Sequence, residues 1–312
     1  MNLFGVMRST GKFSSGFFFV ELTNFLTKLR RLKSVLILSG ISLLCFSQAY
    51  AAQQVSVNEQ RILLATDGGN LLLKASNDKL YRSDDEGEKW AAIKLPQSGS
   101  KNAITSLAVA AKSKNIWYVA TQGIGILRTT DGGKSWTKCN SELPNKNVVA
   151  LTAHADLPNT IYAYIAEHGI YRSEDSGAHW RLMDKGPRQK IQKFIHTNMP
   201  GSMQTGWLFA ATKNGVARSM DCFCGWQNAG SLPEAVLAVS YDLRAPTHVY
   251  ALTQRDFLIS TDGGEEWTHR SLPHDGLSTI ISTLSGWLYV GGNHSLFRSR
   301  DEGMTWEEID AP

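Results

Sequence analysis

The sequence has few cysteines, no helical periodicity and no apolar run long enough to span a membrane. Of the four cysteines in 312 residues, three follow residue 51, and an odd number cannot form a closed framework of disulfides. The apolar run Val35 to Phe46 is shorter than the about 20 residues that a transmembrane helix needs. Without apolar residues at helical spacing, the chain is expected to be built from strands.

The sequence also lacks net charge once its first 51 residues are set aside. The whole chain carries 32 Lys and Arg against 28 Asp and Glu, but six of these basic residues and one of these acidic residues precede Ala52. Residues 52–312 therefore hold 26 basic and 27 acidic side chains. A nearly neutral protein lacks the positive surface that nucleic acid requires, so nucleic acid is not expected as a partner.

Residues 1–51 have the pattern of a secretory signal peptide with an extension ahead of it. A basic segment, residues 28–33, precedes the apolar run, which ends at the small-residue site Ala49-Tyr50-Ala51. This order of segments is typical of a signal that is cleaved, here after Ala51. The pattern predicts a periplasmic or secreted protein, residues 52–312, with no membrane-spanning segment.

One motif, Ser/Thr-x-Asp-x-Gly-x-x-Trp, recurs along the rest of the chain. Its aspartate and tryptophan positions are Asp85 and Trp90, Asp131 and Trp136, Asp175 and Trp180, Asp221 and Trp226, Asp262 and Trp267, and Asp301 and Trp306. The fourth copy is degenerate, because Phe223 stands in the glycine position. A spacing of about 40 residues between copies is typical of propellers.

Each repeat contains four short stretches of strand-like sequence separated by turn residues. In the third repeat they are Val148 to His154, Thr160 to Ile165, Gly169 to Ser173 and Trp180 to Met183. Four strands per repeat make one propeller blade. The chain is therefore predicted to be all-β, a single propeller of six four-stranded blades. Seven blades would need shorter repeats and are the second choice.

The motif falls in the turn between the third and fourth strands, where a structural role explains it. The Asp carboxylate can accept backbone N–H groups and pair with the hydroxyl two residues earlier. The Gly supplies a position with positive φ, and the Trp packs beneath the turn and holds it on the blade. The segment Asp84 to Gly87 resembles the start of a calcium loop, but the later ligands are missing. We therefore expect no metal and no cofactor.

With these motifs the sequence resembles the BNR, or Asp-box, repeat family of propellers. That family includes sialidases, sortilin-type receptors, some glucanases and photosystem II assembly factors. The resemblance extends from about residue 58 to the C-terminus. It implies a propeller with the boxes at the blade periphery, on the face opposite the usual active site, and it implies no shared activity.

No catalytic residue is predicted. The resemblance to sialidases would require an Arg-Ile-Pro signature, and the nearest match, Arg244-Ala245-Pro246, aligns with a turn. Arginines before the motifs form a repeated column rather than a cluster: Arg82, Arg128, Arg172, Arg218 and Arg298. A glycoside hydrolase would need two carboxylates about 5 to 10 Å apart, and the sequence does not tell whether any two of the scattered acids converge.

Cysteine supports no metal site either. Cys139, Cys222 and Cys224 remain after the signal. Cys222 and Cys224 either form a small disulfide in place of the missing glycine or stay reduced, and both alternatives are open. Two thiols one residue apart are too few ligands for zinc.

The turns between the second and third strands vary most from blade to blade. They are Asn77-Asp78, Gln122-Gly123, Glu167-His168, Lys213-Asn214, Gln254-Arg255 and Asn293-His294. One interpretation is that such turns are polar because they are exposed to solvent. The other is that together they form a binding surface around one opening of the central channel. The second interpretation gives the candidate binding residues Glu167, His168, Lys213, Asn214, Gln254, Arg255, Asn293 and His294.

The favoured function is an exported, non-catalytic propeller that binds another protein or protein complex in the envelope as a scaffold or as an assembly or stability factor. The alternative is a sialidase-like glycoside hydrolase or a carbohydrate-binding propeller, with a glycan as its partner.

Overall fold

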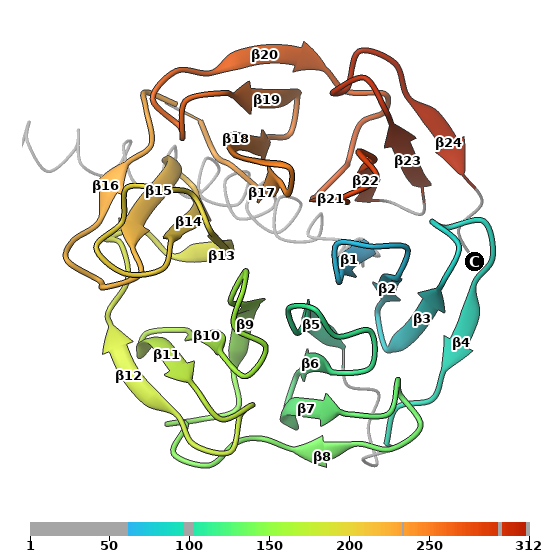
Figure 1. Ribbon diagram of the computed structural model, residues 1–312, viewed down its shortest axis with the longest axis vertical. Helices are drawn as coiled ribbons and strands as arrows, with labels where there is room; N and C mark the ends of the chain where they lie inside the picture. Colours follow the sequence, from blue (N-terminus) through green and yellow to red (C-terminus); the bar gives the residue numbers. More distant parts are fainter. Residues whose placement is uncertain (1–61, 97–102, 233, 293–294, 310–312) are drawn as a thin grey trace, which may run out of the picture. The chain divides into compact units, whose positions relative to one another are not determined.

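The computed structural model describes residues 62–96, 103–232, 234–292 and 295–309. The expected signal peptide, residues 1–51, lies outside the described residues. The described residues form 24 strands in six antiparallel four-stranded sheets and contain no helix. The sheets are arranged as blades around a centre (Figure 1). The prediction of an all-β propeller with six four-stranded blades is confirmed, and the seven-bladed alternative is wrong.

Every blade follows the same order of strands, from the centre outwards. The innermost strands are β1 (Ile62–Thr66), β5 (Ile104–Val109), β9 (Val148–Ala153), β13 (Ile191–Thr197), β17 (Ala238–Asp242) and β21 (Thr279–Ser282). The second strands are β2 (Leu72–Ser76), β6 (Trp117–Thr121), β10 (Ile161–Ile165), β14 (Trp207–Thr212), β18 (Ala245–Leu252) and β22 (Leu288–Gly292). The third strands are β3 (Lys79–Ser83), β7 (Gly125–Thr129), β11 (Gly169–Ser173), β15 (Gly215–Met220), β19 (Asp256–Ser260) and β23 (Ser295–Ser299). The outer strands are β4 (Ala91–Ile93), β8 (Thr137–Lys138), β12 (Arg181–Asp184), β16 (Gln227–Asn228), β20 (Thr268–Ser271) and β24 (Glu307–Ile309).

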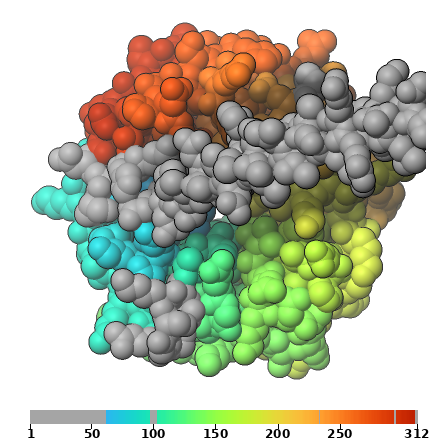
Figure 2. Space-filling view, turned by 180° about the vertical axis from the view of Figure 1, so that it is seen from behind, coloured from blue at the N-terminus to red at the C-terminus, as the bar shows by residue number. Residues whose placement is uncertain are grey.

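This up-and-down order divides the connections between two faces of the ring. Turns from the first to the second strand and from the third to the fourth, such as 154–160 and 174–180, lie on one face, which we call the box face. Turns from the second to the third strand, such as 166–168, lie on the other, the hairpin face. Seen from behind, the blades again follow one another in sequence order (Figure 2).

The core is divided into six buried clusters, one at each interface between neighbouring blades. Successive side chains of a strand point to opposite faces of its sheet, and both faces are covered. In β6, Trp117 and Val119 pack towards blade one, whereas Tyr118 and Ala120 pack towards blade three. The second strands therefore read as nearly continuous apolar segments rather than alternating ones.

The turns that carry the repeated motif share one hydrogen-bond pattern in five blades. Ser83 Oγ donates to Asp85 Oδ1 (2.8 Å) and accepts from the Gly87 N–H (2.8 Å), while Asp85 Oδ1 accepts from the Lys89 N–H (2.9 Å). The turns beginning at residues 129, 173, 260 and 299 repeat these bonds. Such bonds stabilise the ionised carboxylate, and with the hydroxyl of Ser135 they lower the pKa of Asp131 to about 2.

In blades two, three and five, the tryptophan of the motif joins its turn to a backbone carbonyl of the preceding blade. The indole Nε1 of Trp136 donates to the carbonyl of Lys94 (3.2 Å), that of Trp180 to Cys139 (3.1 Å), and that of Trp267 to Ala229 (2.9 Å). The sequence indicates packing beneath the turn within one blade. In these three blades the structure adds a hydrogen bond to the neighbour, so these motifs also hold two blades together.

Three of the repeated arginines contact the next blade around the ring rather than the preceding one. Arg128 Nη1 donates to the carbonyl of Ser176 (3.3 Å), and Arg218 Nη1 to that of Gly263 (2.6 Å). Arg298 Nη1 pairs with Glu88 Oε1 (2.6 Å), which joins the last blade to the first. These contacts support the structural interpretation of the column.

The ring closes without exchanging a strand, because β24 lies in the same sheet as β21 to β23. Side chains seal the joint between blades six and one. Trp287 Nε1 donates to Glu86 Oε2 (3.0 Å), and Tyr289 Oη donates to the Glu86 carbonyl (3.0 Å).

Candidate functional site

The innermost strands surround a cavity of about 160 Å³. All six blades contribute to its lining, through residues that include Asp67, Val109, His154, Lys193, Tyr241 and Ser282. Most of these residues come from the ends of the innermost strands or from the turns that follow them. The cavity therefore lies towards the box face.

Among the described residues that line the cavity, Asp67 is the only carboxylate and Lys193 the only lysine. Asp67 Oδ1 accepts a hydrogen bond from the Gly69 N–H (2.9 Å). Burial disfavours an ammonium ion and lowers the pKa of Lys193 to about 8. A glycosidase of the usual kind needs two carboxylates across the bond that it breaks, and this lining supplies one.

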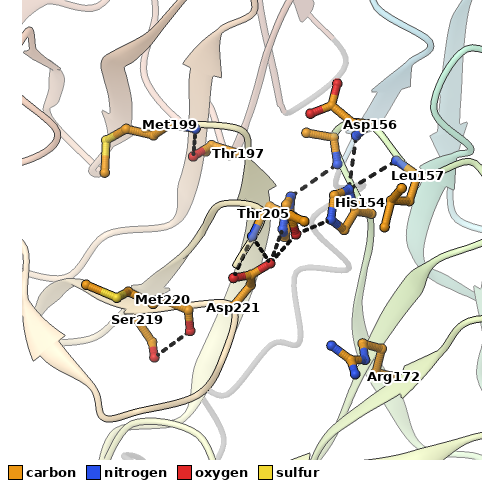
Figure 3. A network of polar contacts seen from close by, with 12 residues as sticks. His154, Asp156, Leu157, Arg172, Thr197, Met199, Thr205, Ser219, Met220 and Asp221 are labelled. Carbon is orange, nitrogen blue, oxygen red and sulfur yellow. Dashed lines mark hydrogen bonds and ion pairs between the residues drawn. The ribbon is translucent and has the colours of Figure 1, made fainter. Parts of the chain in front are cut away.

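A buried polar network borders the cavity between blades three and four (Figure 3). His154 follows β9, His196 lies in β13, and the two rings stack with their centroids 3.8 Å apart. Thr205 precedes β14 and Asp221 follows β15. His154, His196 and Asp221 are all buried, so each polar atom needs a partner within the protein.

The backbone fixes which nitrogen of each ring carries a proton. His154 Nδ1 accepts from the N–H groups of Asp156 (3.0 Å) and Leu157 (3.1 Å), so Nε2 is protonated and donates to Thr205 Oγ1 (2.7 Å). His196 Nδ1 likewise accepts from the Ala155 N–H (3.1 Å), which leaves its Nε2 as a donor 3.5 Å from an Asp221 oxygen.

Asp221 collects the other bonds of this network. Its Oδ2 accepts from the Thr205 N–H (3.1 Å) and from the Thr205 hydroxyl. Burial alone would raise the pKa of Asp221, but the bonds from His196 and Thr205 outweigh it and lower that pKa to about 2. Burial, together with the neighbouring His196, lowers the pKa of His154 to about 4.

The fourth turn therefore departs from the other five further than its sequence indicates. Asp221 leaves its own turn for the network, and the Ser219 hydroxyl donates to the Met220 carbonyl (3.1 Å) instead. Neither histidine belongs to a motif, so sequence reasoning missed both. A comparison of columns is the signal that would find His154, because its N–H makes the strand-to-strand bond that Ala110 and Thr283 make in other blades.

The three buried groups have atoms within 4.8 Å of one another, close enough in principle to hold a metal ion. Their hydrogen bonds oppose this. A metal on Nε2 of a neutral histidine would move the proton to Nδ1, where it would face backbone N–H donors. Ligating histidines instead donate their second N–H to an acceptor. The arrangement fits a hydrogen-bond network rather than a metal centre.

The six sequence-predicted binding residues that the structure describes occupy the hairpin face. Glu167 forms an exposed ion pair with Lys190 (3.7 Å), and His168 Nδ1 lies 3.3 Å from Asn145 Nδ2. Lys213 and Asn214 join β14 to β15, and Gln254 and Arg255 join β18 to β19. Asn293 and His294 lie outside the described residues. None of the six described residues lines the central cavity.

Exposed apolar side chains gather on the opposite, box face. Five large apolar side chains are exposed among the described residues: Leu157, Leu182, Met203, Leu284 and Met304. All but Leu182 lie in turns of the box face, and Met203 is 70% exposed. Because exposed apolar side chains favour contact with a partner, the box face is the candidate interaction surface. Sequence reasoning favoured the hairpin face and gave no weight to leucine and methionine in these turns.

The structure also shows the state of the cysteines. A disulfide joins Cys222 to Cys224 in the fourth turn. Cys139 is a buried free thiol between blades two and three, and burial raises its pKa.

Comparisons with known proteins agree with this architecture. The model of the Sortilin-Vps10 family, described as "Sortilin, neurotensin receptor 3", matches residues 78–214. Over 268 residues the chain is 32% identical to Xyloglucanase Xgh74A of Acetivibrio thermocellus, an alignment that covers 74% of this chain and 28% of the relative. The chain spans about a quarter of the length of the curated xyloglucanases that it matches.

Solved structures share the fold at lower identity. One described as "YCF48 bound to D1 peptide" is 17% identical with a TM-score of 0.55, over 80% of this chain and 82% of that one. The "Nidogen/Laminin Complex" is 12% identical with a TM-score of 0.64, over 77% and 93%. The matches support a propeller of the BNR/Asp-box type. Within the described part of this propeller, no helix is long and apolar enough to cross a membrane.

Proposed function

We propose that this chain is an exported, non-catalytic BNR/Asp-box propeller that binds another protein, as a scaffold or as an assembly or stability factor. The observation that carries the proposal is the confinement of most exposed large apolar side chains of the described residues to the box face. A lone exposed leucine is ordinary. Leu157, Met203 and Leu284 stand in corresponding turns, from the first to the second strand, of blades three, four and six, on the face towards which the cavity lies.

The architecture suits a rigid platform. Hydrogen bonds from Trp180 and Arg128 both join the motif turn of blade three to blade two, and those from Trp267 and Arg218 both join the motif turn of blade five to blade four. A binding surface built on such turns loses little conformational entropy when a partner docks. Structures with the same fold include YCF48 bound to a D1 peptide and a nidogen/laminin complex, so the proposed role has precedents at the level of the fold.

Export rests on the pattern of residues 1–51. The proposal places the mature chain, from Ala52 onwards, in the periplasm or outside the cell. Fractionation of the producing cells and the intact mass of the envelope form test this point. A mass that begins at Ala52 is expected, and a full-length form that stays in the cytoplasm would contradict export.

The test of partner binding uses a tagged chain and two sets of variants. The triple variant Leu157→Ser, Met203→Ser and Leu284→Ser removes three exposed apolar side chains from the box face. The control variant, Lys213→Ser with Arg255→Ser, changes the hairpin face instead. We expect a stoichiometric partner to be isolated from the native envelope with the parent and with the control variant, and to be lost with the triple variant. Loss with the control alone would move the binding surface to the hairpin residues.

A carbohydrate role is the second candidate, favoured by the matches to xyloglucanases. The described residues of the cavity lining offer one carboxylate, which counts against hydrolysis there but not against binding of a glycan. Affinity electrophoresis in a gel that contains xyloglucan separates the candidates. Retardation of the native chain would support carbohydrate binding, and unchanged mobility is expected from the protein-binding proposal.

A further inference from the structure

The fourth turn is closed by a covalent bond where the other five are closed by hydrogen bonds. In those five turns, the Ser or Thr hydroxyl and the Asp carboxylate hold the backbone together. In the fourth, Asp221 belongs to the network with His196, and the Cys222–Cys224 disulfide spans the tip of the turn. Reduction can therefore open the disulfide of the fourth turn, whereas the hydrogen bonds of the other five turns do not respond to it.

The two sulfur-bearing residues differ in accessibility. Cys224 is exposed and Cys222 is half-buried. The next residue, Gly225, has open space around it, since nothing lies within 4 Å of the position that a side chain would take. A thiol reagent can therefore approach Cys224 from solvent, whereas the free thiol of Cys139 is buried in the core.

The loop closed by this disulfide is too short for the bond to stabilise the fold appreciably. A disulfide restricts the unfolded chain more as the loop that it closes grows longer, and this loop encloses one residue, Phe223. Other contacts already fasten the segment. Phe223 packs against Tyr162, with ring centroids 6.3 Å apart, and Trp226 Nε1 donates to Asp184 Oδ1 (2.7 Å). The fold should therefore survive cleavage of the bond.

We propose that Cys222 and Cys224 form a thiol–disulfide exchange site whose partner is a dithiol. A thiolate of that dithiol attacks Cys224 Sγ, a mixed disulfide forms, and Cys222 leaves as a thiolate. The second thiolate of the partner then attacks its own sulfur in the mixed disulfide, and Cys224 leaves. The pair gains two electrons and takes up the two protons that the dithiol gave up, while the partner becomes a disulfide. The reaction runs in reverse when the partner is an oxidised pair.

The test uses the whole purified chain with Cys45→Ser, so that its cysteines are Cys139, Cys222 and Cys224, in glutathione buffers of varied ratio of reduced to oxidised form. Free thiols are trapped with a maleimide under native conditions and counted by intact mass, and tryptophan fluorescence reports the fold. We expect no maleimide at the oxidised end and two at the reduced end, with native fluorescence throughout. Two maleimides at every ratio, or none until the protein unfolds, would overturn the proposal.

Single variants test which sulfur is attacked. In Cys222→Ser the exposed Cys224 remains, and in Cys224→Ser the half-buried Cys222 remains. We expect oxidised glutathione to modify Cys222→Ser at least tenfold faster than Cys224→Ser. Equal rates, or the opposite order, would overturn the assignment of Cys224 as the attacked residue. Cys139→Ala serves as the control and should leave both rates and the redox titration unchanged.

Discussion

Acidification should weaken the contact between blades three and four, because His154 is buried there as a neutral ring. Burial lowers the pKa of His154 from 6.5 to about 4. Between these values the unfolded chain binds more protons than the folded protein, so the free energy of unfolding falls as the pH falls. A shift of about 2.5 units corresponds to about 3 kcal/mol. This stability is fully present above pH 6.5 and is lost by about pH 4.

The assay is urea unfolding at several values between pH 7 and pH 4, with His154→Asn as the matched variant. The asparagine Oδ1 can still accept from the N–H groups that His154 Nδ1 now binds, those of Asp156 and Leu157, but it does not titrate. The other ionisable groups nearby, His196, Asp221, Asp156 and Arg172, are common to both proteins. The stability advantage of the parent should shrink by about 3 kcal/mol across the range. A constant difference would refute the reasoning.

Further predictions concern stability and activity. Trp180→Ala should lower the free energy of unfolding by about 3 to 5 kcal/mol, because Trp180 is only 4% exposed. Trp180→Phe should lower it by about 1 kcal/mol, because it removes the hydrogen bond to the Cys139 carbonyl. Equal losses in urea titrations would rule out burial as the main contribution. Gly264→Ala should lower the free energy of unfolding by about 1 to 3 kcal/mol, since φ is +90° and the new Cβ would lie 2.8 Å from Ala229 Cβ. An unchanged melting temperature would disprove this prediction. No reducing sugar should be released from xyloglucan, because the described residues that line the cavity include one carboxylate, Asp67. Release above a boiled control would contradict this prediction.

The architecture could be predicted from the sequence because the repeat supplies the same evidence six times. Each copy marks one turn, and the apolar stretches between copies mark strands, so errors at single positions do not change the number of blades. In the third repeat, the predicted strand Gly169 to Ser173 coincides with β11. Trp180 and Arg128 have their hydrogen-bond partners in neighbouring blades, and periodicity within one blade does not predict such contacts.

The candidate site was harder to predict because it consists of departures from the repeat. His154 and His196 carry no motif, and they meet only because β9 and β13 are adjacent innermost strands. Asp221 keeps the identity of a motif residue but makes different bonds. The polar hairpin residues follow from the repeat, whereas the exposure of Met203 depends on how its long turn folds.

Site-specific photocrosslinking tests the central claim most directly. A photoreactive amino acid is placed in blade four, either at Met203 on the box face or at Lys213 on the hairpin face, and both positions are exposed. The two chains are produced in their native envelope and illuminated. The account predicts one discrete crosslinked protein from position 203 and none from position 213. Crosslinking from position 213 alone would contradict the box face as the binding surface, and no crosslink from either position would contradict protein binding by this blade.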